Sequence, residues 1–133
     1  MTMEAALSVA VLAALKAAPG LAALNRIGSG EGERAPVPHA WISEITGVEW
    51  GVKDRLGREL RLVLAIADRG EAARLTDLSA AAEAALAAVP RPLGDWDHSG
   101  LRVVRVRTVQ RRDGTRVTTI EARVRILAPA NSN

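Results

Sequence analysis

The strongest constraint on the fold is the stretch RELRLVLAIA, residues 58–67. Large aliphatic residues stand at every second position, namely Leu60, Leu62, Leu64 and Ile66. Glu59 and Arg61, on either side of Leu60, point the other way. A period of two is that of a β-strand with one buried face. The chain therefore has to form a sheet with one apolar face that other elements cover.

Two segments have the period of an amphipathic helix and are predicted to cover that face. The first is residues 3–18, with Leu7, Val11, Leu15 and Ala18 at helical spacing; the second is residues 71–89, with Leu75, Leu78, Ala82, Leu86 and Val89 along one stripe. Val9 and Leu12 give the first helix a second apolar side. We therefore expect this helix to be covered on more than one side, with a neighbouring subunit as a source of that cover.

A second strand is predicted over residues 39–50, which are rich in β-branched and aromatic residues, with a bend at Gly47. Its inward face is ambiguous: Trp41 and Ile45 point one way and Ile42, Val48 and Trp50 the other. Loops are predicted at 25–38, 53–57 and 91–100, the first of them flexible because of its Gly and Pro content. Residues 128–133 are predicted to be a disordered tail.

The segment 102–126 is predicted to be a hairpin around Asp113-Gly114. A three-residue loop, 113–115, makes one face apolar by pairing Val104 with Val124, Val106 with Ala122 and Thr108 with Ile120. The reverse face is then basic, with one acidic partner, Glu121, beside Arg107. Its residues are Val103, Arg105, Arg107 and Val109 opposite Arg125, Arg123, Glu121 and Thr119.

These elements predict a single α+β domain over residues 1–133, a mainly antiparallel sheet of about four strands packed against two main helices. The absence of cysteine excludes disulfides and thiolate metal sites. The apolar run at 5–15 is shorter than a bilayer span of about 20 residues, so a soluble helix is predicted. Residues 28–32 follow no predicted strand, open no helix and lack the Lys-Ser/Thr pair of a phosphate-binding loop, so they are interpreted as a connector.

Two weak signals for chemistry have simpler interpretations. Asp95, Asp97 and His98 have the side-chain types of a metal or acid–base site, but residues flanked by Gly94 and Gly100 are also typical of a turn, which we favour. The arginines of the hairpin suggest a nucleic-acid surface. However, the net charge is only +3 and no aromatic residue lies among them, so a sheet face that is either solvated or turned toward another subunit is favoured.

The order of these segments resembles that of the tail completion, or tail terminator, proteins of long-tailed bacteriophages and phage-like gene transfer agents. The residues that carry the resemblance are an Ala/Leu-rich first helix, LAAL (21–24), a Gly-rich loop, PVPHAWIS (36–43), GRELRLVLAIAD (57–68), an Ala-rich helix, GLRVVRVRT (100–108) and RRDGTR (111–116). The similarity covers nearly the whole chain, although its motifs are diffuse. His39 stands where relatives often have an aromatic residue.

The resemblance implies a non-enzymatic structural subunit without cofactor or metal. Six copies would form a ring at the head-proximal end of the tail tube, in a particle assembled in the bacterial cytoplasm. Its partners would be its own copies, the tail tube protein and a head connector or stopper, with no membrane. The alternatives are a basic module contacting DNA in the ring lumen or, less favoured, a small enzyme using Asp95, Asp97 and His98.

Within that ring we expect two sets of contacts. Subunit contacts would involve Leu12, Lys16, Arg105, Arg107, Arg123 and Arg125. Axial contacts to tube or connector would involve the Gly-rich segment together with Lys53, Asp54, Arg55, Arg58, Arg111, Arg112 and Asp113. The loops of the second set are expected to become ordered on docking.

Overall fold

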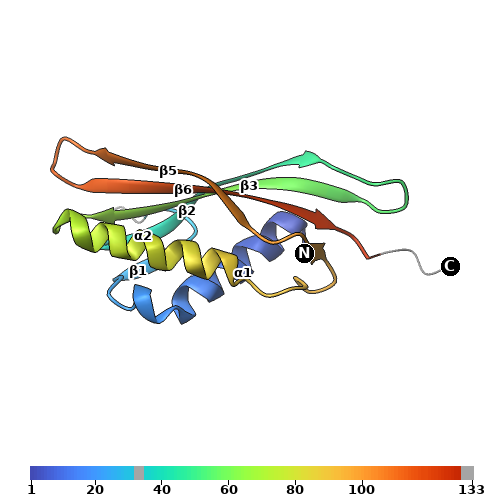
Figure 1. Ribbon diagram of the computed structural model, residues 1–133, viewed down its shortest axis with the longest axis horizontal. Helices are drawn as coiled ribbons and strands as arrows, with labels where there is room; N and C mark the ends of the chain where they lie inside the picture. The colour runs from blue at the N-terminus through green and yellow to red at the C-terminus, as the bar shows by residue number, and fades with distance from the viewer. Residues whose placement is uncertain (32–34, 130–133) are drawn as a thin grey trace.

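The computed structural model describes residues 1–31 and 35–129. Two helices and a six-stranded sheet form one α+β domain (Figure 1). The elements are α1 (Met3–Ala17), the short 3-10 helix η1 (Pro19–Leu21), β1 (Arg26–Gly28), β2 (His39–Glu49), β3 (Gly57–Asp68), α2 (Ala72–Ala87), β4 (Asp97–His98), β5 (Arg102–Gln110) and β6 (Arg116–Leu127).

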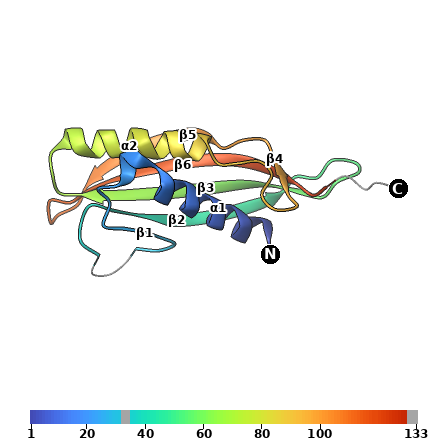
Figure 2. The same ribbon diagram turned by 90° about the horizontal axis from the view of Figure 1, so that it is seen from below.

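The sheet is ordered β1-β2-β3-β6, and β6 then pairs with β4 near its end and with β5 along the rest of its length. All pairs are antiparallel except β1 with β2. Both helices lie on the same face of the sheet (Figures 1 and 2). The predicted fold class is thus confirmed, and β2, β3, β5 and β6 are its four long strands.

The two short strands lie inside segments that were predicted as loops. β1 falls within residues 25–38 and β4 within residues 91–100. β1 has only three residues and becomes a strand by parallel pairing with the start of β2. Such long-range pairing leaves no local pattern in the sequence, and the loop predictions were wrong at these positions for that reason.

The core lies between the helices and the inner face of the sheet. Leu60, Leu62, Leu64 and Ile66 of β3 are fully buried there, as the alternation predicted. The helices contribute their predicted stripes, and Leu7, Val11, Leu75 and Leu86 are all at most 4% exposed. Each such aliphatic side chain contributes about 1.5–3 kcal/mol on burial. Thr2 caps α1, its Oγ1 accepting the Ala5 N–H at 3.0 Å.

A β-bulge resolves the ambiguous face of β2. Its pairing with β3 shifts between Ile42 and Glu44, so that Ser43 is the extra residue. The shift places Ile42 and Ile45 on the same, inner face. Trp41 lies on the opposite face, in a small cluster of its own with Ala65 and neighbours. The sequence predicts a bend at Gly47, but pairing continues there without a break, with Gly47 opposite Leu60. The irregularity of the strand lies at Ser43 instead.

The hairpin of β5 and β6 forms, but its predicted register is wrong by two residues. Gln110 pairs with Arg116, leaving a five-residue connection, and Val106 faces Ile120 instead of Ala122. The longer turn is held by the Arg111 N–H, which donates to the Thr115 carbonyl at 2.7 Å, and by Gly114 at a φ of 87°. A bulge after Val103 then places that residue, and not Val104, on the inner face opposite Ala122.

Ala128, the first residue of the predicted tail, is held in place by two hydrogen bonds. The Ala128 N–H donates to the Leu56 carbonyl at 2.8 Å, and its own carbonyl accepts from Arg55 Nε at 2.7 Å. The prediction for residues 130–133 falls outside the described residues.

Candidate interaction surface

The outer face of the sheet, the face opposite the helices, carries rows of charged residues. At its centre the Arg61 guanidinium lies 3.0 Å from Glu44 and 2.9 Å from Glu121, one carboxylate from β2 and one from β6. The hydrogen bond to Glu44, followed in size by the one to Glu121, raises the pKa of Arg61 above its ordinary value. The face is therefore mixed in charge and not uniformly basic.

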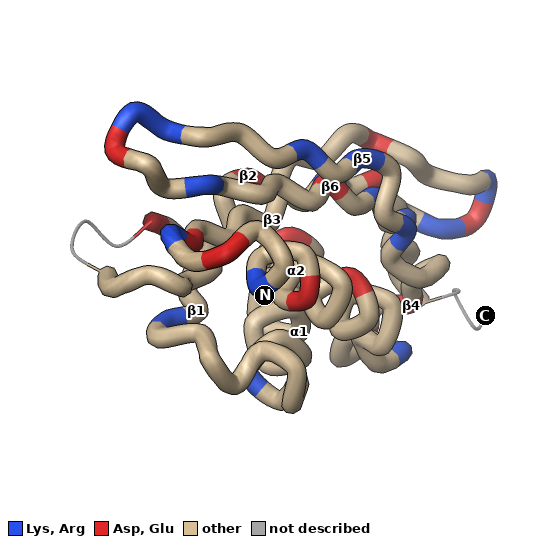
Figure 3. The backbone as a smooth tube through the Cα atoms, turned by 60° about the vertical axis from the view of Figure 1, so that its left-hand side comes forward, with Lys and Arg blue, Asp and Glu red and all other residues tan. Residues whose placement is uncertain are grey.

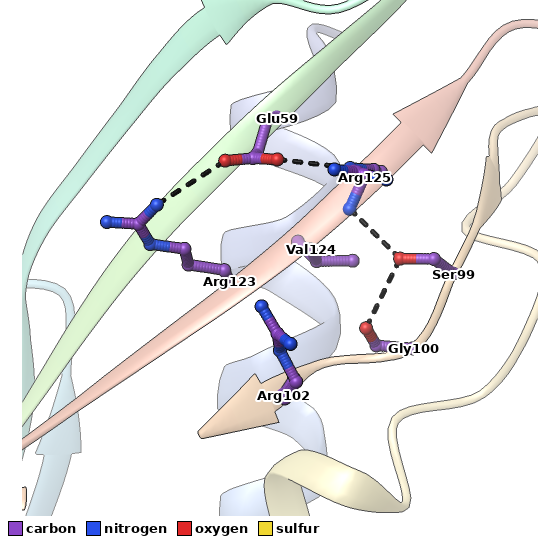
Figure 4. A pocket seen from close by; sticks show the side chains of 7 residues that line it. All are labelled: Glu59, Ser99, Gly100, Arg102, Arg123, Val124 and Arg125. Atoms are coloured by element: carbon purple, nitrogen blue, oxygen red, sulfur yellow. Dashed lines mark hydrogen bonds and ion pairs between the residues drawn. The ribbon is translucent and has the colours of Figure 1, made fainter. Parts of the chain in front are cut away.

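A second group of charges surrounds Glu59 on β3. Glu59 lies 3.6 Å from Arg123 and 3.1 Å from Arg125, and the Arg125 guanidinium also stands 4.5 Å above the centre of the Trp50 ring. Figure 4 shows this group around a hollow between β6 and the start of β5, where Arg102 also points in. Arg102 has no carboxylate within 4.0 Å among the described residues.

The structure separates the four predicted contact arginines of the sheet into two pairs. All four lie on the outer face, but Arg123 and Arg125 are already paired with Glu59 of their own chain. Arg105 and Arg107, on β5, have no carboxylate within 4.0 Å in the described part of the chain. The predicted acidic partner is misplaced as well: in the observed register Glu121 faces Arg105, and Arg107 faces Thr119.

Leu12 and Lys16 lie on α1, across the molecule from these arginines. Leu12 is half-buried and packs against the core, whereas Lys16 is exposed in the last turn of the helix. Val9, on the same helix, is 58% exposed. The six predicted contact residues thus form two separate surfaces, one on the helical layer and one on the sheet.

The predicted axial residues lie at the two opposite ends of the sheet (Figure 3). Lys53, Asp54, Arg55 and Arg58 belong to the β2–β3 end. Arg55 lies 3.7 Å from Asp97 and Arg58 lies 2.7 Å from Glu4, so both arginines form ion pairs within their own chain. Lys53 and Asp54 are exposed at the tip of this loop.

Arg111, Arg112 and Asp113 form the turn at the other end. Arg111 reaches Glu31 of the Gly-rich segment at 2.9 Å, which raises the pKa of Arg111. The Asp113 carboxylate accepts the Thr115 N–H, which is the main cause of its lowered pKa, and pairs with Arg69 at 3.3 Å. Arg112 is exposed.

His39 lies next to this end and was not predicted as part of any site. The residue is 4% exposed, and its ring stacks on Trp41 with 5.1 Å between the ring centroids. Neither ring nitrogen has a hydrogen-bond partner within the described residues. It lines a polar hollow together with Arg69 and Arg111. The position after a proline in PVPHAW gave no signal of burial.

Asp95, Asp97 and His98 do not form a common site. The His98 ring is buried, its Nδ1 accepting the Gly100 N–H at 3.0 Å and its Nε2 donating to the Pro90 carbonyl at 2.9 Å. Asp97 faces Arg55 instead. Within the described ranges no group of three potential ligands could hold a metal ion. The turn interpretation agrees with the paired Leu93 and Trp96 backbones and with Gly94 at a φ of 60°.

The acids that balance the outer face gave no clear signal in the sequence. Alternation in β3 had placed Glu59 and Arg61 outward, but Glu44 reaches the same face only because of the bulge at Ser43. In the described part of the chain, no helix is both long and apolar enough for a membrane crossing.

Comparison with known proteins shows the fold. The structure is similar to a chain described as "Virion of native gene transfer agent (GTA) particle", with a TM-score of 0.66 and 15% sequence identity over 95% of each chain. No family model and no curated protein matches the sequence.

Proposed function

We propose that this chain is a structural subunit of a phage-like particle. Six copies form a ring at the head-proximal end of the tail tube, where they terminate the tail and join it to the head connector or stopper. In this role the chain binds its own copies and the two neighbouring protein layers, and it carries out no catalysis.

The observation that carries this proposal is the shared fold with a chain of a gene transfer agent virion, which extends over 95% of both chains. A likeness of this extent involves the whole domain, including both helices and the long strands. It agrees with the order of segments in the sequence, which resembles that of tail terminator proteins.

The surface of the molecule supports a ring. A ring is closed by heterologous contacts, in which two different patches of each subunit meet. This chain has an exposed apolar residue, Val9, on α1, and, on the other side of the molecule, Arg105 and Arg107, which have no ion pair among the described residues. α1 packs beside β1 and β2. Leu12 and Lys16 therefore belong, with the β2 side of the molecule, to one side of a repeated contact, and Arg105 and Arg107 on β5 belong to the other.

The two charged ends support axial contacts. If the strands run along the ring axis, the loop around Lys53 faces one neighbouring layer and the turn around Arg112 faces the other. This arrangement gives the tail tube and the connector separate docking surfaces on the same ring.

The mass of the native protein tests the proposal. We expect the purified chain, alone or mixed with tail-tube subunits, to give a species of six times 14.1 kDa, about 85 kDa, or a complex that contains it. Native mass spectrometry resolves such a mass from that of a monomer. A chain that stays monomeric under both conditions, and that is missing from purified tails, would overturn the proposal.

A further inference from the structure

On each side of the sheet one long strand has an outer edge that is free over most of its length among the described residues. β5 pairs only with β6, so its other edge is free. At the opposite side of the sheet β1 covers β2 only along residues 39–41, and residues 42–49 of β2 have a free edge. Free edges present unpaired N–H and C=O groups and are templates for another strand.

β5 exposes apolar side chains and arginines without carboxylate partners among the described residues, a combination that favours contact with another chain. Val104 is 41% exposed and Val106 46% exposed, although neither is polar. Between and beside them, Arg102, Arg105 and Arg107 have no carboxylate within 4.0 Å in the described part of the chain. Two β5 strands would place arginines opposite each other, which disfavours a symmetric pair. The partner strand should therefore be acidic.

The free edge of β2 has a carboxylate at the level of Arg105. The strand pairings connect the two edges across the sheet: Arg105 faces Glu121, Glu121 faces Val63, and Val63 faces Glu44. Glu44 and Arg105 therefore lie at the same height on opposite edges, both on the outer face. The Glu44 carboxylate side chain is 46% exposed and free on the side away from Arg61.

On the inner face, apolar residues of β5 and β2 lie at the same heights on the two edges. Val103 connects through Ala122 and Leu62 to Ile45, so that one partly buried aliphatic residue lies level with another. Val106 connects in the same way through Ile120 and Leu64 to Ile42.

Neighbouring subunits of a ring are related by rotation about the ring axis, which leaves the position of each residue along that axis unchanged. If the strands run along this axis, residues at equal height on the two edges meet between neighbours. The order of strands also makes β5 of one copy antiparallel to β2 of the next, since directions alternate from β2 through β3 and β6 to β5.

We propose that β5 of one copy pairs with the free edge of β2 of the next copy, with Arg105 opposite Glu44 and Val103 opposite Ile45. This inference rests on the proposed ring and describes how it closes. β1 already occupies the β2 edge at residues 39–41. The proposed pairing therefore involves residues 102–106 of β5 and 42–46 of β2.

A competing partner for β5 is α2 of another copy, where the exposed Asp77 and the partly buried Glu83 stand among alanines. A helix uses its own N–H and C=O groups internally and leaves the edge of β5 unpaired. A second strand satisfies both the arginines and the backbone, so the edge of β2 is the better partner.

Cysteine cross-linking tests the contact. The chain has no cysteine, and we would introduce the pair Arg105→Cys and Glu44→Cys. Within one chain these positions are separated by β6 and β3, about 14 Å at strand spacing, beyond the roughly 7 Å limit for a disulfide. Any disulfide between the two positions is therefore intermolecular.

We expect mild oxidation of the double variant to give a ladder of covalent oligomers that ends at the ring size. The single variants should give dimers at most. The matched control is Arg105→Cys with Asp77→Cys, which should not form a ladder. A ring of normal native mass that gives no ladder with the Glu44 pair, or an equal ladder with the Asp77 pair, overturns the contact while leaving the proposed function intact. A wild-type chain that forms no ring, alone or with tube subunits, contradicts the proposed function itself.

A charge-reversal set supplies a second readout. Arg105→Glu and Glu44→Arg should each reduce the ring fraction at least tenfold, and the double variant should restore it. Circular dichroism and thermal unfolding of each variant report whether the domain is folded. Folded single variants that keep the ring, or a double variant that does not recover it, would contradict the specific pairing.

Discussion

At the scale of single residues, Asp68 is a buried charge with four hydrogen bonds to its carboxylate. Its side chain is 1% exposed and stands at the end of β3. One carboxylate oxygen accepts from Arg74 Nε at 2.7 Å, and the other accepts from Arg74 Nη2 and from the N–H groups of Arg69 and Gly70. A buried carboxylate with this many donors links β3 to the first turn of α2.

We predict that Asp68→Asn lowers the free energy of unfolding by about 2 kcal/mol at neutral pH. The amide removes the charge and directs an N–H₂ group at donors, which leaves buried hydrogen bonds unmade. Urea unfolding measures the change. Asp77→Asn, on the exposed side of the same helix, is the control and should stay within about 0.5 kcal/mol.

The loss of stability in Asp68→Asn should also depend on pH. The hydrogen bonds from Arg74, reinforced by the backbone N–H groups, hold the pKa of Asp68 below its ordinary value of 3.8. A carboxyl with a lowered folded pKa stabilises the protein above its unfolded pKa, and this contribution is lost as the pH falls through the folded value. The difference between wild type and Asp68→Asn should therefore shrink below about pH 4. A difference that stays constant between pH 7 and pH 3 would contradict this assignment.

At the scale of elements, α1 has one apolar face in the core and another in solvent. Val11 is 0% exposed and Val9 58% exposed, two positions apart on the same helix. Sequence periodicity identified the first face correctly. The prediction that the second side is covered stays a prediction, because nothing within the described chain covers Val9.

The two valines give a matched pair of substitutions. We predict that Val11→Ala lowers the free energy of unfolding of the isolated chain by about 2 kcal/mol, through lost burial and the cavity left behind. Val9→Ala should change it by less than about 0.5 kcal/mol. Denaturant titrations of both variants under the same conditions decide the point, and equal losses would show that Val9 is also buried in the species studied.

The elements also show where sequence reading succeeds and where it ends. The alternation in β3 and the stripes of α1 and α2 predicted the core correctly, because their periods are set by burial on one side. The register of β5 on β6 was wrong because it was inferred from matching apolar residues, and β5 is an edge strand with little burial. The bulges after Ile42 and Val103 depend on long-range pairing, and the position of Glu44 could not be predicted without them.

At the scale of the whole molecule, the long strands place two charged tips at opposite ends. The sequence predicts axial contacts at both tips, but their relative position depends on the pairing of the strands. Figure 3 shows that the β2–β3 loop and the β5–β6 turn lie far apart. Under the proposed function, this separation implies that the joint to the tube and the joint to the connector are made by different ends and fail independently.

Charge reversal at each tip tests that independence. Lys53 and Arg112 are exposed and have no ion pair in the described part of the chain, so Lys53→Glu and Arg112→Glu should leave the fold and the ring mass unchanged. We predict that one variant weakens binding to tail tubes at least tenfold and keeps connector binding, and that the other does the reverse. Cosedimentation with purified tubes and with purified connectors measures the two separately. If both variants weakened the same joint, the two tips would have to meet one partner, and strands lying along the ring axis would be ruled out, because an axial orientation directs the tips to opposite layers.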